Sequence, residues 1–213
     1  MTLAAVLLAG FLLGMRHATD PDHVVAVSTI VTRFRSVARA AGVGALWGIG
    51  HTATILIVGG AIILFEITIP PRLGLAMELA VAAMLIVLGV VNLLGRPPAD
   101  DAAFAPAKPV TIGFVHGLAG SAAVALLVLT AIGDPGWSLA YLVVFGAGTV
   151  GGMMLVTAAL ALPLRIGATR IGGFQRHLRL ATGAASVAFG LFIVHQIGVA
   201  DGLFTENPTW DPH

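Results

Sequence analysis

The stretch Arg16-His17-Ala18-Thr19-Asp20-Pro21-Asp22-His23 decides the fold of this chain, because it places five ionisable side chains between two apolar segments. The segment before it, residues 3–15, is too short to cross a bilayer alone, since a spanning helix needs about 20 apolar residues. A second apolar segment, residues 24–31, follows the polar block. We therefore place the block inside the membrane. Pro21 has no N–H to donate to the carbonyl of His17, so we predict that the first helix is broken there.

The rest of the chain has the composition of an integral membrane protein. Of its 213 residues, 58% are hydrophobic and 10% are charged, whereas soluble domains carry about 25% charged residues. Apolar runs between charged residues, prolines and glycines predict an all-α, polytopic membrane protein with about six transmembrane helices. We expect these spans at residues 3–32, 41–65, 73–95, 110–133, 137–162 and 180–199, within one integral membrane domain over residues 1–213.

The distribution of Lys and Arg predicts how the chain lies in the cell membrane. Three follow the first span, two follow the third and four follow the fifth, whereas only Arg72 lies in a connection on the other side. The positive-inside rule then places both termini outside the cytoplasm, in the cytoplasmic (inner) membrane. The formal net charge of +1, without a basic run, argues against nucleic acid as a partner. The lack of cysteine excludes disulfides and thiolate metal sites.

The two halves of the chain match weakly but in register. Residues 13–18 align with 112–117 at an offset of 99, residues 48–51 with 146–149 at 98, and residues 88–89 with 189–190 at 101. Each half would hold an odd number of spans, so the second copy enters the membrane the opposite way up, which predicts a 3+3 inverted repeat. The predicted parts are repeat 1 at about 1–95, a cytoplasmic linker at 96–109, repeat 2 at about 110–200 and a short acidic tail at 201–213.

The polar block predicts a metal site. Each charge at the centre of a membrane span costs roughly 2.5–3.5 kcal/mol, so intramembrane ionisable residues are usually functional. An unwound turn can bring His17, Asp22 and His23 onto one centre, and two imidazoles with a carboxylate suit a divalent first-row ion. The second carboxylate, Asp20, can orient an imidazole from behind. The alternative is a structural polar plug, in which the histidines bond to the carboxylates and Arg16 pairs with Asp20 or Asp22.

Two further histidines lie in predicted spans beside small residues, which permit a close approach of helices. His51 is followed by Thr52, and we expect His51 to be a third or fourth ligand. His116 aligns with His17 in the repeat and is followed, five residues later, by the hydroxyl of Ser121. His116 can complete the site or line the exit path, or it can be a helix-packing contact.

The block at residues 16–23 resembles the R-H-A-x-D-x-D-H signature of the nickel/cobalt permease superfamily, and Gly50-His51-Thr52 is similar to the G-H-S/T motif of that family's next span. The resemblance implies import of Ni²⁺ or Co²⁺ to supply enzymes such as urease or hydrogenase. It also implies that His17, Asp22, His23 and His51 recognise the ion. Nickel-enzyme maturation proteins would act downstream, and we expect no permanently bound cofactor.

The chain departs from typical members of this superfamily in two respects. It starts at the signature helix, without the helix that precedes it in the eight-span members. Its second half has residues 116–121 where those members carry an acidic F-D-T-x-T-E motif. In both respects it resembles the short branch that includes urease-accessory-type membrane proteins.

Three alternatives explain part of the same pattern. A metal exporter would use the same midplane site, because alternating access serves either direction. An intramembrane hydrolase would use Ser121 as nucleophile with His51 or His116 as base, although His116 would point about 140° away from Ser121 on a regular helix. A di-haem carrier would explain the histidines but not the carboxylates. Without a G-x-x-x-x-G-K-[ST] run for ATP hydrolysis, we expect a secondary transporter rather than an enzyme.

Overall fold

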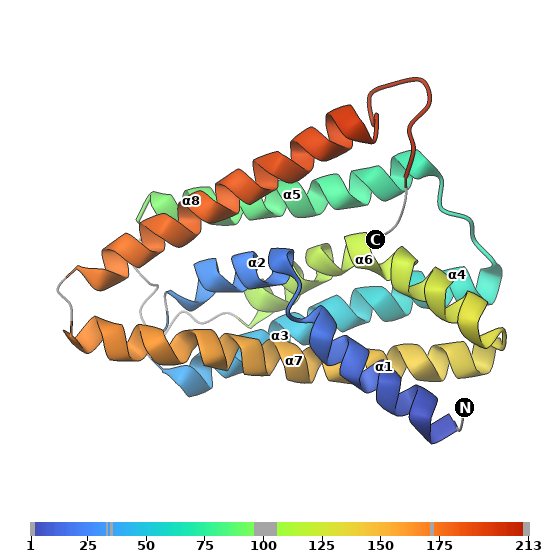
Figure 1. Ribbon diagram of the computed structural model, residues 1–213, viewed down its shortest axis with the longest axis horizontal. Helices are drawn as coiled ribbons and strands as arrows, with labels where there is room; N and C mark the ends of the chain where they lie inside the picture. The colour runs from blue at the N-terminus through green and yellow to red at the C-terminus, as the bar shows by residue number, and fades with distance from the viewer. Residues whose placement is uncertain (1–2, 33, 35, 96–105, 171–172, 211–213) are drawn as a thin grey trace.

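The computed structural model describes residues 3–32, 34, 36–95, 106–170 and 173–210, and all regular elements in these ranges are helical (Figure 1). The α-helices are α1 (Leu3–His17), α2 (Pro21–Val31), α3 (Val37–Thr54), α4 (Gly60–Phe65), α5 (Pro71–Leu93), α6 (Ala107–Ile132), α7 (Pro135–Arg170) and α8 (Phe174–His195). Two π-helical turns, η1 (Ile55–Gly59) and η3 (Gln196–Ala200), continue α3 and α8. The predicted all-α class is confirmed.

This is a membrane protein. Within the described residues, four helical stretches are long and apolar enough to cross a membrane, namely Val37–Phe65, Pro71–Leu93, Pro135–Pro163 and Phe174–Ala200. Two shorter apolar helices, Ala4–His17 and Pro21–Val31, follow each other in the chain at residues 3–32. Large apolar side chains, such as Leu8, Ile57 and Leu191, are exposed on the outside of the bundle. A soluble monomer does not expose so much apolar surface, whereas lipid accepts it.

The helix at the polar block is interrupted where Pro21 predicts an interruption. α1 ends at His17, and α2 begins at Pro21, the first helical position, where a missing N–H costs no hydrogen bond. Between them, Thr19 donates its N–H to the carbonyl of Arg16 at 2.8 Å, and Asp20 donates to that of His17 at 3.1 Å. These turns pair backbone groups that lipid would leave unsatisfied. Side chains of both half-helices can therefore meet at one place.

Some boundaries differ from the prediction. α7 continues to Arg170, past the predicted end at residue 162, and carries Pro163 in its interior. A proline usually ends a helix, but membrane helices tolerate it where neighbours satisfy the freed backbone groups. α6 begins at Ala107, so the last residues of the predicted linker are helical. The rest of that linker, residues 96–105, lies outside the described residues.

Glycines allow several pairs of helices to cross with their backbones in contact, among them α1 with α7, α3 with α6, and α5 with α8. At several glycines of these helices an added Cβ would lie less than 3.0 Å from a backbone carbonyl oxygen of the partner helix, which real Cβ atoms do not tolerate. Such pairs include Gly14 with Phe145, Gly148 with Phe11, Gly113 with Trp47, Gly50 with Val110, Gly89 with Gly183 and Gly190 with Ala82. Small residues at such crossings are typical of membrane helix pairs.

Figure 1 shows α5 and α8 side by side along one edge of the molecule, with α1, α3, α6 and α7 grouped opposite them and α2 between. The C-terminal segment returns from the end of α8 to α5. The indole N–H of Trp210 donates to Oε1 of Glu78 at 2.8 Å, and the ring covers Gly74. Arg72 also donates to the carbonyl of Thr205 at 3.2 Å. These contacts attach the end of the described chain to the bundle.

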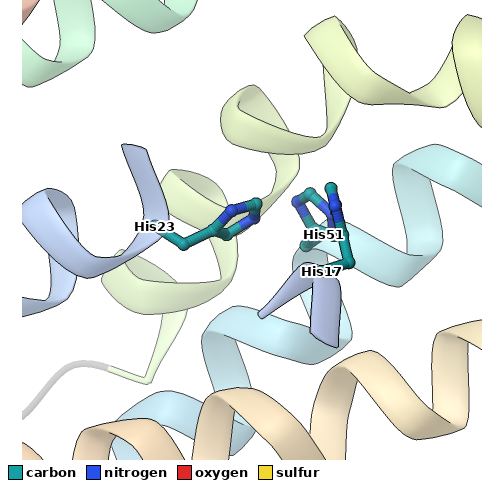
Figure 2. Close-up of side chains that lie close together, drawn as sticks. All are labelled: His17, His23 and His51. Carbon is teal, nitrogen blue, oxygen red and sulfur yellow. The ribbon is translucent and has the colours of Figure 1, made fainter. Parts of the chain in front are cut away.

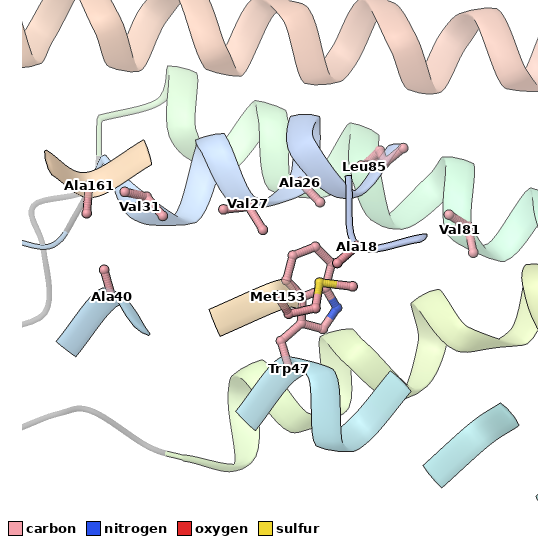
Figure 3. Close-up of a cluster of buried hydrophobic side chains, with 10 residues drawn as sticks. All are labelled: Ala18, Ala26, Val27, Val31, Ala40, Trp47, Val81, Leu85, Met153 and Ala161. Atoms are coloured by element: carbon pink, nitrogen blue, oxygen red, sulfur yellow. The ribbon is translucent and has the colours of Figure 1, made fainter. Parts of the chain in front are cut away.

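Two groups of buried apolar side chains fill the bundle on either side of the polar block. The Trp47 cluster (Figure 3) joins α2 to the first part of α3, to α5 and to the second half of α7. The Phe145 cluster joins η1 and α4 to the second half of α6 and the first half of α7. Members of the Trp47 cluster are Ala18, Ala26, Val27, Val31, Ala40, Trp47, Val81, Leu85, Met153 and Ala161; those of the Phe145 cluster are Ile55, Ile62, Ile63, Val128, Tyr141, Leu142 and Phe145.

Candidate metal centre

Four histidines gather where α1, α2, α3 and α6 meet. His17 ends α1, His23 lies in the first turn of α2, His51 lies in the last turn of α3, and His116 is in α6. The ring centroid of His23 lies 4.7 Å from that of His17, 5.0 Å from His51 and 4.4 Å from His116. Figure 2 shows the rings of His17, His23 and His51 turned toward one another. His23, His51 and His116 are each at most 2% exposed.

The first set of possible ligands consists of imidazoles alone, and we call it the His17 group: His17, His23 and His51. One nitrogen of each lies within 4.8 Å of the others. Nε2 of His17 is 3.0 Å from Nε2 of His51. This distance suits a hydrogen bond between the rings. It also suits two ligands of one ion, because nitrogens about 2.1 Å from a metal and at about 90° to each other lie about 3.0 Å apart.

Asp20 orients the first imidazole. Its Oδ2 lies 2.8 Å from Nδ1 of His17. An N–H on Nδ1 donates to this carboxylate, which holds the ring in the tautomer whose Nε2 carries the lone pair, so that Nε2 can accept a hydrogen bond from His51 or bind a metal ion. Asp20 is the N-cap residue of α2, but its carboxylate makes no capping hydrogen bond to that helix.

The second set contains a carboxylate, and we call it the Asp22 group: Asp22, His23 and His116. Its ligand atoms also lie within 4.8 Å of one another. Oδ2 of Asp22 is 3.0 Å from Nε2 of His116. Oδ1 accepts the backbone N–H of His23 at 2.9 Å and lies 3.2 Å from its Nδ1. The four residues expected to share one centre, His17, Asp22, His23 and His51, are thus divided between two groups that have His23 in common.

Several imidazole nitrogens at this site have no hydrogen-bond partner among the described residues. They are Nε2 of His23, Nδ1 of His51 and Nδ1 of His116. A buried polar atom without a partner destabilises the fold by about 1–3 kcal/mol, so buried polar atoms are nearly always paired. The lone pair of a neutral imidazole nitrogen is a ligand for a transition-metal ion. Together with the carboxylate of Asp22, these nitrogens form a donor set that fits a divalent ion.

Two aromatic rings enclose the histidines. The ring of Phe145 lies 5.5 Å from that of His17, and the indole of Trp47 lies 5.8 Å from His23 and 5.4 Å from His116. Each ring belongs to the apolar cluster that bears its name, whereas the carboxylates stay partly open: the side chain of Asp22 is 31% exposed and that of Asp20 is 46% exposed. The sequence contains one signal for Trp47, which precedes His51 by four residues and so shares its helix face.

The remaining predicted residues take other places. Thr52 donates its hydroxyl to the carbonyl of Gly146 at 3.1 Å, which ties α3 to α7. Arg16 is exposed, and no carboxylate in the described part of the chain pairs with it, which removes one contact of the structural polar plug. The side chain of Ser121 lies outside what the structure describes, so the hydrolase alternative is not tested.

Fold and site together define an α-helical membrane protein with a buried histidine and carboxylate cluster. The chain is 35% identical over 219 residues to the urease accessory protein UreH of Bacillus sp. (strain TB-90), and the alignment covers 95% of this chain and 96% of the relative. It belongs to the family of that urease accessory protein, as its resemblance to urease-accessory-type membrane proteins predicts. No protein-family model matches the chain, and no solved structure does.

Proposed function

We propose that this protein is a secondary transporter, a permease that carries Ni²⁺, or Co²⁺, inward across the cytoplasmic membrane. One observation carries the proposal: four histidines and Asp22 converge inside an apolar helical bundle, with imidazole nitrogens that lack hydrogen-bond partners. Ionisable residues in such a place are costly and mark ion or substrate pathways. A site between two apolar clusters, with the carboxylate of Asp22 partly exposed, suits an ion that is bound and then released.

Two features support nickel as the cargo. Imidazole and carboxylate ligands accept Ni²⁺ and Co²⁺ readily. The relative is a urease accessory protein, and urease is an enzyme that the permease resemblance implies as a destination for nickel. Nickel-enzyme maturation proteins would receive the ion.

We further propose the six-span, 3+3 inverted repeat with repeats at about 1–95 and 110–200. The glycine crossings support it. The contact of Gly14 with Phe145 has its counterpart in the contact of Gly113 with Trp47, at the sequence offsets of 99 and 98. An inverted repeat requires each crossing between the halves to occur twice in this way.

Two further pairs of crossings obey the same rule. The contact of Gly148 with Phe11 corresponds to that of Gly50 with Val110, again at offsets of 98 and 99. The contact of Gly89 with Gly183 corresponds to that of Gly190 with Ala82, at the third offset of 101. The weak sequence similarity and the close helix contacts therefore support the same three offsets, 98, 99 and 101.

The membrane potential can drive the proposed transport. A divalent cation that moves inward across 100 mV gains roughly 4.6 kcal/mol, from about 2.3 kcal/mol per charge. The excess of Lys and Arg in the connections after the odd-numbered spans supports an orientation with both termini outside the cytoplasm.

Uptake of Ni²⁺ by the purified protein in liposomes tests the proposal. With the vesicle interior negative, we expect saturable uptake that Co²⁺ inhibits more strongly than Zn²⁺, and at least about 100-fold slower uptake for His17→Ala. His195→Ala is the matched control, because this histidine is exposed in the last turn of α8. A wild-type protein that carries neither ion at any potential would refute the proposal, and one that only expels nickel would be an exporter.

Uptake should also fall in acid. Metal binding requires neutral imidazoles, so protons compete with the ion for the ring nitrogens. At fixed potential we therefore expect the uptake rate to fall as the pH is lowered from about 7.5 toward about 4. The measurement is the initial rate of ⁶³Ni²⁺ uptake against pH with the potential clamped. Saturable uptake that is unchanged across this whole range would remove the imidazoles from the transport site.

A further inference from the structure

We infer that the transported ion occupies two positions in turn, the His17 group and the Asp22 group, and that His23 stays bound to it while the other ligands are exchanged. This inference rests on the proposed transport function and makes His116 a direct ligand. The two groups share only His23, and in each of them the ligand atoms lie within 4.8 Å of one another. Neither group alone offers more than three side chains.

The position of His23 suits an exchange. Its ring centre lies 4.7 Å from His17 on one side and 4.4 Å from His116 on another. Its Nδ1 faces Oδ1 of Asp22 at 3.2 Å, and its Nε2 lacks a hydrogen-bond partner among the described residues. A neutral imidazole offers a single lone pair. His23 therefore binds one ion at a time, and occupation of one position excludes the other.

The two positions are built alike. His17 and His116 correspond at the offset of 99 in the repeat, and Phe145 and Trp47 correspond at 98. Each of these histidines packs against the aromatic ring of the opposite half, at 5.5 Å for His17 and 5.4 Å for His116. In an inverted repeat, rocking of the halves exchanges which end of a midplane site is open. Such rocking would open only one of the two positions at a time, together with the aromatic ring that packs against it.

The two ligand sets differ in charge, and this difference favours passage of the ion. The His17 group is formed by neutral rings, whereas the Asp22 group contributes a carboxylate. Each set leaves part of the coordination shell of a divalent ion to water. Transport requires sites that bind firmly enough to admit an ion and loosely enough to release it. A partial shell at each of two neighbouring positions meets both requirements.

Parallel measurements of binding and transport test the inference. Ni²⁺ binding is measured by titration calorimetry in detergent and Ni²⁺ uptake in liposomes, for wild type, His17→Ala, His116→Ala and the double variant. We expect one ion per chain for wild type and for each single variant, with affinities within about tenfold of wild type. Uptake by each single variant should fall at least about 100-fold, and the double variant should lose binding.

Other results would overturn it. If the His116→Ala variant took up Ni²⁺ at the wild-type rate, His116 would be a helix-packing contact and not a ligand. If His17→Ala or His116→Ala alone abolished Ni²⁺ binding, the ligands would form one composite site. His116→Gln, which keeps much of the side-chain volume, separates ligand loss from misfolding, as does the elution profile of each variant on size exclusion. If the wild-type protein itself neither binds nor carries Ni²⁺ or Co²⁺, the transport function fails, and that result is distinct from either of the others.

Discussion

His23→Ala is expected to abolish nickel binding and nickel transport together, with a larger effect than any other single substitution at the site. His23 is the member that the His17 group and the Asp22 group share, so its loss leaves two side chains at each position. We expect the affinity for Ni²⁺ to fall at least about 1,000-fold, which corresponds to about 4 kcal/mol of binding free energy. His17→Ala, by contrast, leaves the Asp22 group complete.

Calorimetric titration of purified His23→Ala with Ni²⁺, beside uptake in liposomes, measures this effect. The imidazole is only 1% exposed, so the substitution also leaves a cavity, and stability must be measured separately. Tryptophan fluorescence on heating provides the melting temperature, and His195→Ala is the control for a histidine outside the site. A folded His23→Ala protein that binds nickel within tenfold of wild type would contradict the central role of this residue.

The interruption of the first helix could be predicted because its cause is local. Pro21 cannot continue the hydrogen bonding of α1, and five ionisable side chains cannot face lipid. Both facts are visible in eight consecutive residues, and α1 and α2 do meet there. The apolar composition likewise predicts an all-α membrane protein without reference to distant contacts.

The division of the ligands into two groups could not be predicted in this way. Asp22 meets His116, 94 residues away in the sequence, and that contact depends on how closely α3 and α6 approach each other and the polar block. Their distance is set by Gly50 and Gly113, whose missing side chains matter only when the partner helix is known. Small residues beside His51 and His116 indicate that helices approach closely there, but the sequence does not say which helices meet.

Gly50→Ala is the second substitution with a large expected effect. The new methyl group would collide with the backbone carbonyl of Val110 in α6, and a backbone atom cannot turn aside as a flexible side chain can. α3 and α6 would have to separate, which displaces His51 from the other histidines. We expect the free energy of unfolding to fall by about 3 kcal/mol or more, at the upper end of the range for overpacking. Nickel uptake should be lost with it.

Gly42→Ala in the same helix is the matched control. Gly42 is exposed, and a Cβ added there would meet nothing within 4 Å. This substitution should raise stability by up to about 1 kcal/mol, because alanine favours a helix over glycine. Gly148→Ala, the counterpart of Gly50 in the second half, should act like Gly50→Ala, since its Cβ would collide with the carbonyl of Phe11. Melting temperatures of the three variants in detergent measure the differences, and equal stability for Gly42→Ala and Gly50→Ala would rule out the backbone contact between α3 and α6.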